Sequence, residues 1–98
     1  MTIEPKLIDT INNFLSYHST LSLASCQDNV PWSSDLFYVH DHRFNLYFIS
    51  SSNTQHALNI ARNPTVSVSI SKQYERWESI KGIQIKGKAH VISGIERI

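Results

Sequence analysis

The chain has 98 residues, which suits one domain around a single core. Nine Lys and Arg side chains oppose eight Asp and Glu side chains, so the net charge of +1 gives no field that would attract a nucleic acid. The single cysteine excludes an intrachain disulfide and no apolar stretch is long enough to span a membrane, so we expect a soluble cytoplasmic protein with one domain over residues 1–98.

The first predicted element is an amphipathic helix. Apolar residues recur at helical spacing from Leu7 to Leu15, and Pro5 suits the first turn because the N–H that it lacks would have no partner there. The period then changes to two over residues 20–26, which predicts a strand. Residues 27–31 predict a turn after it.

Two further strands are predicted over residues 32–40 and 43–50. The polar corner His40-Asp41-His42 joins them into a hairpin. Its two imidazoles could bind a metal ion, but no third ligand is apparent, so a solvated turn is the favoured interpretation. We therefore predict no metal site.

A short helix follows the hairpin. Its apolar side is predicted to consist of Ala57, Leu58 and Ala61. Asn63-Pro64 ends it, because a residue before proline avoids helical geometry. This helix is therefore inserted between two strands.

Two more strands are predicted near the C-terminal end. Residues 65–70 place their branched apolar side chains on one face, and residues 83–92 alternate in the same way, with an interruption or bulge at Gly87. Residues 72–79 are predicted to form a polar connection between them or a short helical turn around Trp77, and residues 93–98 look like the start of another helix. Five strands and the earlier helices predict a mainly antiparallel sheet that curls into a small barrel.

The segment before the short helix, residues 50–54, is rich in hydroxyl groups. The first N–H groups of a helix lack intrahelical partners and attract phosphate or carboxylate. Capping of the helix by Ser52 or Asn53 is the simpler interpretation, and the residues alone favour it. No glycine-rich phosphate-binding loop accompanies the segment.

No residue stands out as a catalytic acid, base or nucleophile. No G-x-S-x-G motif surrounds a serine, and among the strand carboxylates only Asp35 is notable.

Four aromatic residues could stack on a flat ring, but filling the core is the default for them in a small β domain: Trp32, Phe37, Tyr38 and Trp77. A polar row on the last strand either faces solvent or is directed at an anion: Gln84, Lys86 and Lys88.

The order of these elements resembles the FMN-binding split barrel of the pyridoxamine 5′-phosphate oxidase-like superfamily, and more closely a small uncharacterised bacterial branch of it. Two marks carry the likeness: the short helix that ends in Asn63-Pro64 before a valine-rich strand, and the I-x-I-x-G-x-A pattern of residues 83–89. The resemblance implies a split β-barrel of the antiparallel Greek-key type, with an N-terminal helix and one inserted short helix. Members of that branch continue past the SGIERI point with a helix and a further strand, so we expect either a C-terminally truncated domain or a dimer that is built differently.

The resemblance also implies a homodimer that binds FMN at its subunit interface, and hence an FMN-dependent oxidoreductase that transfers a hydride at the flavin. At the phosphate, Gln55 and His56 take the positions of an Arg-Lys pair, so an amide and an imidazole replace two fixed charges. The expected cofactor-binding residues are Ser33, Ser34, Tyr38, Ile49, Ser50, Ser51, Thr54, Gln55, His56, Gln84 and Lys86.

Three other functions stay open. The missing phosphate charges and the short C-terminal end favour a cofactor-free dimeric split barrel with a ligand-binding or structural role. A haem-binding split barrel would draw on the five histidines. An oligonucleotide-binding barrel is disfavoured by the near-zero net charge. We therefore expect a small-molecule substrate and neither a nucleic acid nor a membrane as a partner.

Overall fold

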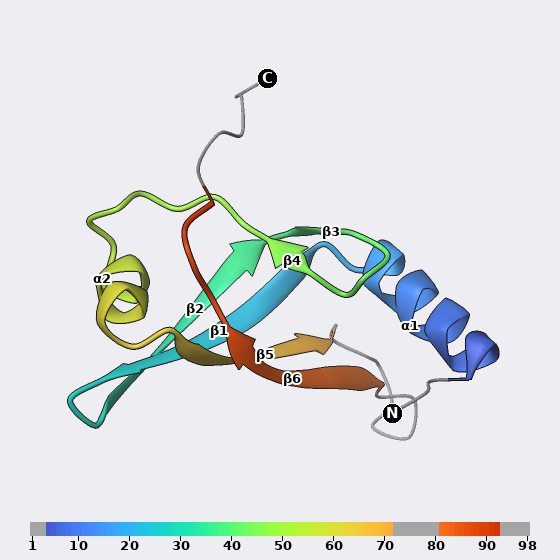
Figure 1. The fold of residues 1–98 in the computed structure, drawn as a ribbon, viewed down its shortest axis with the longest axis horizontal. Coiled ribbons are helices and arrows are strands. Elements are labelled where there is room, and N and C mark those ends of the chain that lie inside the picture. The colour runs from blue at the N-terminus through green and yellow to red at the C-terminus, as the bar shows by residue number, and fades with distance from the viewer. Residues whose placement is uncertain (1–3, 72–80, 93–98) are drawn as a thin grey trace.

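The computed structural model describes residues 4–71 and 81–92 (Figure 1). Its elements in chain order are α1 (Pro5–Tyr17), β1 (Thr20–Gln27), β2 (Val30–Phe37), β3 (Val39–His40), β4 (Leu46–Tyr47), α2 (Gln55–Arg62), β5 (Thr65–Ser71) and β6 (Gly82–Lys88). Four antiparallel strands form one sheet in the order β2-β1-β5-β6, and β3 pairs with β4 in a second sheet. The mainly antiparallel β fold with two helices is therefore confirmed.

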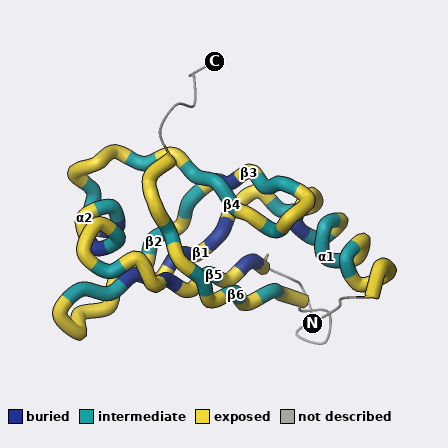
Figure 2. Tube along the Cα trace, in the orientation of Figure 1, coloured by how far each residue is buried: buried dark blue, intermediate teal, exposed yellow. Residues whose placement is uncertain are grey.

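The four-stranded sheet has one buried face and one open face. Along β1 the alternation is regular, because Leu21 and Leu23 are buried while Ser22 and Ala24 are exposed. Buried positions gather in β1 and β5 (Figure 2). The core consists of Leu15, Leu21, Leu23, Tyr38, Val66 and Ile70. We call the opposite side the outer face, and it carries Ser22, Ala24, Ser33, Asp35, Ser67, Ser69, Gln84 and Lys86.

The helix α1 covers one end of the core, as its apolar spacing predicts. Leu15 is 1% exposed, and the partly buried Ile11 and Phe14 pack against the same core. The Tyr38 hydroxyl donates a hydrogen bond of 2.8 Å to the Leu15 carbonyl oxygen, which ties the helix to the strands. Pro5 lies in the first turn, as predicted. No helix in the described part of the chain has the length and apolarity to cross a membrane.

The predicted hairpin strands over residues 32–40 and 43–50 are shorter than expected. The first one splits at Tyr38, whose N–H donates to the Ser19 carbonyl oxygen at 2.9 Å, so that β2 ends before it and β3 pairs with β4. The second loses its first residues to the turn, because Phe44 has a φ of 66° and cannot continue an extended strand. Residues 41–45 therefore form a turn, and β4 keeps two residues.

The predicted apolar side of the short helix is wrong. Leu58 is 49% exposed and Ala61 is exposed, whereas His56 and Asn59 are buried at 7% and 2% exposure. The reason is that α2 packs on a polar end of β1, where the Asn59 amide donates to the Ser25 hydroxyl at 3.1 Å. The inward side of this helix is therefore set by these hydrogen bonds together with Ile60, which packs partly buried against the core.

The last strand is shorter than the predicted residues 83–92, because β6 ends at Lys88. The turn predicted over residues 27–31 is shorter in the structure, because Gln27 belongs to β1 and Val30 and Pro31 belong to β2. Its two residues Asp28 and Asn29 both take positive φ values (52° and 65°), as a two-residue hairpin turn requires. No bulge occurs at Gly87, because it pairs with Val66 in an unbroken register. The predictions for residues 72–79, with Trp77, and for residues 93–98 lie outside the described residues.

Candidate functional site

His56 lies in the first turn of α2, and its ring is the centre of a group of hydroxyls. Its Nε2 atom lies 2.6 Å from the Ser50 hydroxyl oxygen and 3.2 Å from that of Thr54. Its Nδ1 atom lies 3.2 Å from the Ser34 hydroxyl oxygen. We call these four residues the His56 cluster. It joins β2 to α2 and to the segment directly before α2, so two parts of the chain that are separate in the sequence meet at one imidazole.

The segment before α2 folds as a capped helix start, but the cap differs from the prediction. Thr54, and neither Ser52 nor Asn53, is the N-cap residue, and its hydroxyl oxygen accepts from the Ala57 N–H at 3.3 Å. The same hydroxyl donates to the Ser51 carbonyl oxygen at 2.9 Å. Asn53 instead accepts a hydrogen bond of 2.6 Å from the Ser51 hydroxyl. This turn fixes Thr54 beside His56.

The His56 cluster has polar character without a fixed charge. A neutral imidazole has one donor and one acceptor nitrogen, so the hydroxyls on its two sides take opposite roles. A hydroxyl can rotate to suit either role. Among the described residues, none of the hydrogen bonds to the His56 ring comes from a lysine or an arginine. The partial positive charge of the α2 N-terminus is the electrostatic attraction that the backbone supplies here.

A second group of expected cofactor residues lies on the outer face of the sheet. Ser33 belongs to a row that crosses the sheet through Ala24, Ser67 and Lys86. The neighbouring row contains Asp35, Ser22, Ser69 and Gln84, and the Ser22 hydroxyl donates to the Asp35 carboxylate at 2.6 Å. Ser33 and Ser34 are adjacent in β2, so their side chains point to opposite faces. The structure therefore separates Ser33, Gln84 and Lys86 from the His56 cluster.

Three other expected residues lie outside the His56 cluster. Tyr38 is 7% exposed, its hydroxyl is bonded to α1, and burial raises its pKa. Ile49 precedes the cluster residue Ser50 and is 93% exposed. Gln55 directs its amide along α2, where it donates to the Asn59 side-chain oxygen at 2.8 Å. Tyr38 therefore acts as a core residue, while Gln55 belongs to the neighbouring groove described next.

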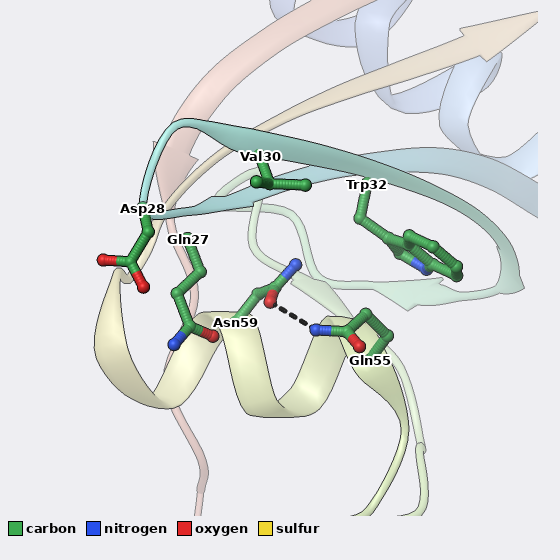
Figure 3. Close-up of a pocket in the computed structure, with 6 residues that line it drawn as sticks. All are labelled: Gln27, Asp28, Val30, Trp32, Gln55 and Asn59. Atoms are coloured by element: carbon green, nitrogen blue, oxygen red, sulfur yellow. Dashed lines mark hydrogen bonds between the residues drawn. The ribbon is translucent and has the colours of Figure 1, made fainter.

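The structure reveals a groove between the start of β2 and α2 (Figure 3). Its volume is about 310 Å³, and it is lined by Gln27, Asp28, Val30, Trp32, Gln55 and Asn59. Trp32 is 48% exposed, so the interpretation that it fills the core is wrong. The same holds for Phe37, which is 79% exposed on the outer side of β2. Trp32 was the residue in the sequence that pointed to a ring-stacking site. The strand pattern alone could not place α2 beside it.

The corner His40-Asp41-His42 is a hydrogen-bonded turn. The Asp41 carboxylate accepts from the N–H groups of Arg43 and Asn45, the Asn45 amide and the Tyr47 hydroxyl, all at 2.8–3.0 Å. The bond from the Asn45 side chain is the largest of the causes that hold the pKa of Asp41 well below its usual range. No group of three His, Cys, Asp or Glu side chains suited to a metal occurs in residues 4–71 and 81–92.

Comparisons with known proteins place these features in a family. A family model described as pyridoxamine 5′-phosphate oxidase matches residues 7–97. A UPF0306 protein of Yersinia pestis is 31% identical over 85 residues, which cover 86% of this chain and 58% of the relative. The chain thus spans less than two thirds of the length of the curated relatives that it matches.

Solved structures show the same architecture. A pyridoxamine 5′-phosphate oxidase-like protein of Listeria innocua superposes with a TM-score of 0.79 at 27% identity, over 90% of this chain and 68% of the other. HutZ, a haem storage protein of Vibrio cholerae, superposes with a TM-score of 0.76 at 22% identity, over 98% of this chain and 67% of the other. The predicted split-barrel fold class is thereby confirmed.

Proposed function

Because the chain belongs to the pyridoxamine 5′-phosphate oxidase family, we propose that it binds FMN and acts as a flavin-dependent oxidoreductase on a small molecule. The His56 cluster at the N-terminus of α2 carries this proposal. There the imidazole gathers the hydroxyls of Ser34 and Ser50 where the family resemblance implies contacts to the FMN phosphate. Thr54 caps the helix at the same point.

The donors of this region suit a phosphate group. The backbone N–H groups of Gln55 and His56 are the first of α2 and have no intrahelical partners. Of the hydroxyls of Ser34 and Ser50, the one that accepts from the imidazole N–H keeps its own proton for a phosphate oxygen, while the other donates to the ring. With no Lys or Arg bonded to the His56 ring within the described residues, we expect FMN to bind less tightly than it would at an Arg-Lys pair. Bound FMN would supply the hydride chemistry, and no side chain is assigned as a catalytic acid or base.

We further propose that the protein is a homodimer in which the outer face is the interface. Gln84 and Lys86 lie on that face, opposite to the side on which Ser34 meets His56. Within one copy these residues also lie on the far edge strand β6, so a cofactor that reaches from the His56 cluster round the edge of β2 would take Gln84 and Lys86 from a second copy. Small side chains such as Ser67 and Ser69 fill the centre of the face and would allow two sheets to approach closely.

The charges at the edges of the outer face suit this arrangement. Asp35 lies on the edge strand β2, and Lys86 lies on the opposite edge strand β6. When two copies pack face to face around a two-fold axis parallel to the strands, β2 of one copy covers β6 of the other. Each Asp35 then lies over Gln84 of the second copy and one row along the strand from its Lys86, twice in one dimer. The attraction between Asp35 and the long Lys86 side chain favours this orientation over one that brings like charges together.

The test is a titration of the purified protein with FMN and, in parallel, with riboflavin, which has the same ring and no phosphate. We expect a saturable change in flavin absorbance and binding of FMN at least tenfold tighter than that of riboflavin, as a site that recognises phosphate requires. Equal affinities would contradict the phosphate site. A folded protein that binds neither flavin would support the cofactor-free alternative, and a haem absorption band in the purified protein would favour a haem-binding role.

A further inference from the structure

The groove between β2 and α2 has the chemistry of a second ligand site, separate from the His56 cluster. One wall is apolar and comes from Val30 and Trp32, which are 63% and 48% exposed. The opposite wall consists of side-chain amides of α2, where Asn59 points towards the strand and the Gln55 amide is directed along the helix to Asn59 (Figure 3). A volume of about 310 Å³ lies at the lower end of the range for small-molecule sites.

The amide wall is fixed in position by buried hydrogen bonds. Asn59 is 2% exposed, and its side-chain nitrogen donates to the Ser25 hydroxyl, which is itself 3% exposed. The Asn59 oxygen accepts from the Gln55 amide at 2.8 Å, so the orientation of the Gln55 amide is set by its neighbour. That bond uses one amide hydrogen of Gln55 and leaves the other hydrogen and the carbonyl oxygen for a ligand.

The charge of the residues that line the groove limits the class of ligand that it can bind. Asp28 is the ionisable side chain that lines the groove, and its carboxylate would repel an anion. The aromatic ring of Trp32 offers a flat surface for stacking, and a primary amide pairs with a ring edge that carries a donor beside an acceptor. We propose that this groove binds a neutral planar heterocycle of the adenine type, stacked on Trp32 and read by the amide of Gln55.

This site is distinct from the proposed FMN phosphate site, although the two are neighbours. Trp32 and Ser34 are two residues apart on the same face of β2, and Gln55 and His56 are adjacent in α2. The side chain of His56 bonds to Ser34 and Ser50, whereas that of Gln55 bonds to Asn59. A base in the groove therefore need not displace a phosphate from the His56 cluster, and its binding does not depend on FMN.

The experiment is an NMR titration of the ¹⁵N-labelled protein with adenosine, which follows the indole N–H signals of the two tryptophans. Trp77→Phe assigns the signals, because the one that remains belongs to Trp32. We expect a saturable shift of the Trp32 signal, and the same shift in the presence of saturating FMN if the protein binds it. Competition between FMN and adenosine would overturn the proposal, because it would place both ligands in one site.

Two matched variants and one matched ligand test the contacts. Trp32→Ala should weaken adenosine binding about tenfold or more through the loss of stacking, and Trp32→Phe should retain most of the affinity. Gln55→Leu and the ligand N6,N6-dimethyladenosine, which lacks the donor, should each weaken binding several-fold. Leu58→Ala, on the exposed side of α2 and outside the lining of the groove, should leave adenosine binding unchanged. If Trp32→Ala does not fold, Trp32→Phe and Gln55→Leu still test the stacking contact and the amide contact with adenosine.

Three results would contradict the inference. The first is the absence of a saturable shift at millimolar adenosine in the folded wild-type protein. The second is equal binding of adenosine and its dimethylated analogue, since this would mean that no amide reads the ring edge. The third is a shift of the Trp32 signal of equal affinity with glucose, since this would assign the groove to sugars.

Discussion

The Nε2 atom of His56 lies 2.6 Å from the hydroxyl oxygen of Ser50, which joins the first turn of α2 to the segment that follows β4. A hydrogen bond of this length holds the imidazole beside the exposed end of the helix. A side chain at position 56 therefore points towards the hydroxyls of the His56 cluster. A substitution at position 56 should therefore change the affinity of the His56 cluster for an anion.

We predict that His56→Lys strengthens FMN binding about fivefold, because a hydrogen bond from a charged donor is stronger than a neutral one by about 1 kcal/mol. Ser50→Ala should weaken FMN binding by a similar factor, through the loss of one donor. The measurement is flavin absorbance or fluorescence during titration. Riboflavin binding is the internal control, because neither substitution should change it. An unchanged FMN affinity in both folded variants would mean that the phosphate lies elsewhere.

The outer face leads to a prediction about assembly. Lys86→Glu should weaken the dimer, because the introduced carboxylate would then face Asp35 of the second copy. Asp35→Lys should do the same by bringing two lysines together. The combined variant Asp35→Lys with Lys86→Glu should restore the dimer, since the pair is reversed. Sedimentation or light scattering over a range of concentrations measures this.

Rescue by the combined variant distinguishes a direct pair from a general effect of charge. Lys88→Glu on the same strand is the matched control for the change in net charge, and we expect it to weaken the dimer less. A wild-type protein that is monomeric at all concentrations would contradict the proposed interface, whatever the outcome for FMN.

The Asp41 turn predicts a dependence of stability on pH. Hydrogen bonds from Asn45 and, to a lesser extent, Tyr47 and Arg43 lower the pKa of the Asp41 carboxyl in the folded state. The stabilisation is therefore present above the unfolded-state pKa, at about pH 4, and is lost as the pH falls towards the folded-state pKa. We expect the free energy of unfolding to fall between roughly pH 4 and pH 2, and to fall less in Asp41→Asn.

Urea unfolding at several pH values measures this difference. Tyr47→Phe is the intermediate case, because it removes one of the hydrogen bonds to the carboxylate and leaves the others. Its slope should lie between those of the wild-type protein and Asp41→Asn. Equal slopes in all three proteins would show that Asp41 has the same pKa in the folded and unfolded states.

Much of this fold could be predicted from the sequence, because the spacing of apolar residues and the residues that end a helix or strand are local properties of the chain. The two-residue alternation in β5 and the Asn63-Pro64 end of α2 are examples, and both occur as expected. The splitting of the strand at Tyr38 could not be predicted, since it depends on a hydrogen bond to Ser19 and on another to Leu15. These partners are fixed only by tertiary packing.

In the candidate site too, some features could be predicted from the sequence and others depend on tertiary packing. The hydroxyls before α2 were a visible signal in the sequence, and Ser50 and Thr54 do meet His56. The residues Ser33 and Ser34 looked equivalent in the sequence, yet they lie on opposite faces of β2. A shift of one residue in a strand reverses the face, so positions carried over from a family resemblance are least reliable there.

The buried side of α2 gives the last prediction. Asn59 and Ser25 are almost fully buried and bond to each other at 3.1 Å. Asn59→Leu would leave the Ser25 hydroxyl and the Gln55 amide without this partner, and we expect it to lower the free energy of unfolding by about 1–3 kcal/mol. Adding Ser25→Ala should recover part of the loss, because an unpaired buried hydroxyl is removed. Leu58→Asn, on the exposed side of the same helix, is the control and should cost less than about 1 kcal/mol. If Leu58→Asn were the more damaging of the two, the helix would face the sheet with its apolar side, as its sequence alone suggests.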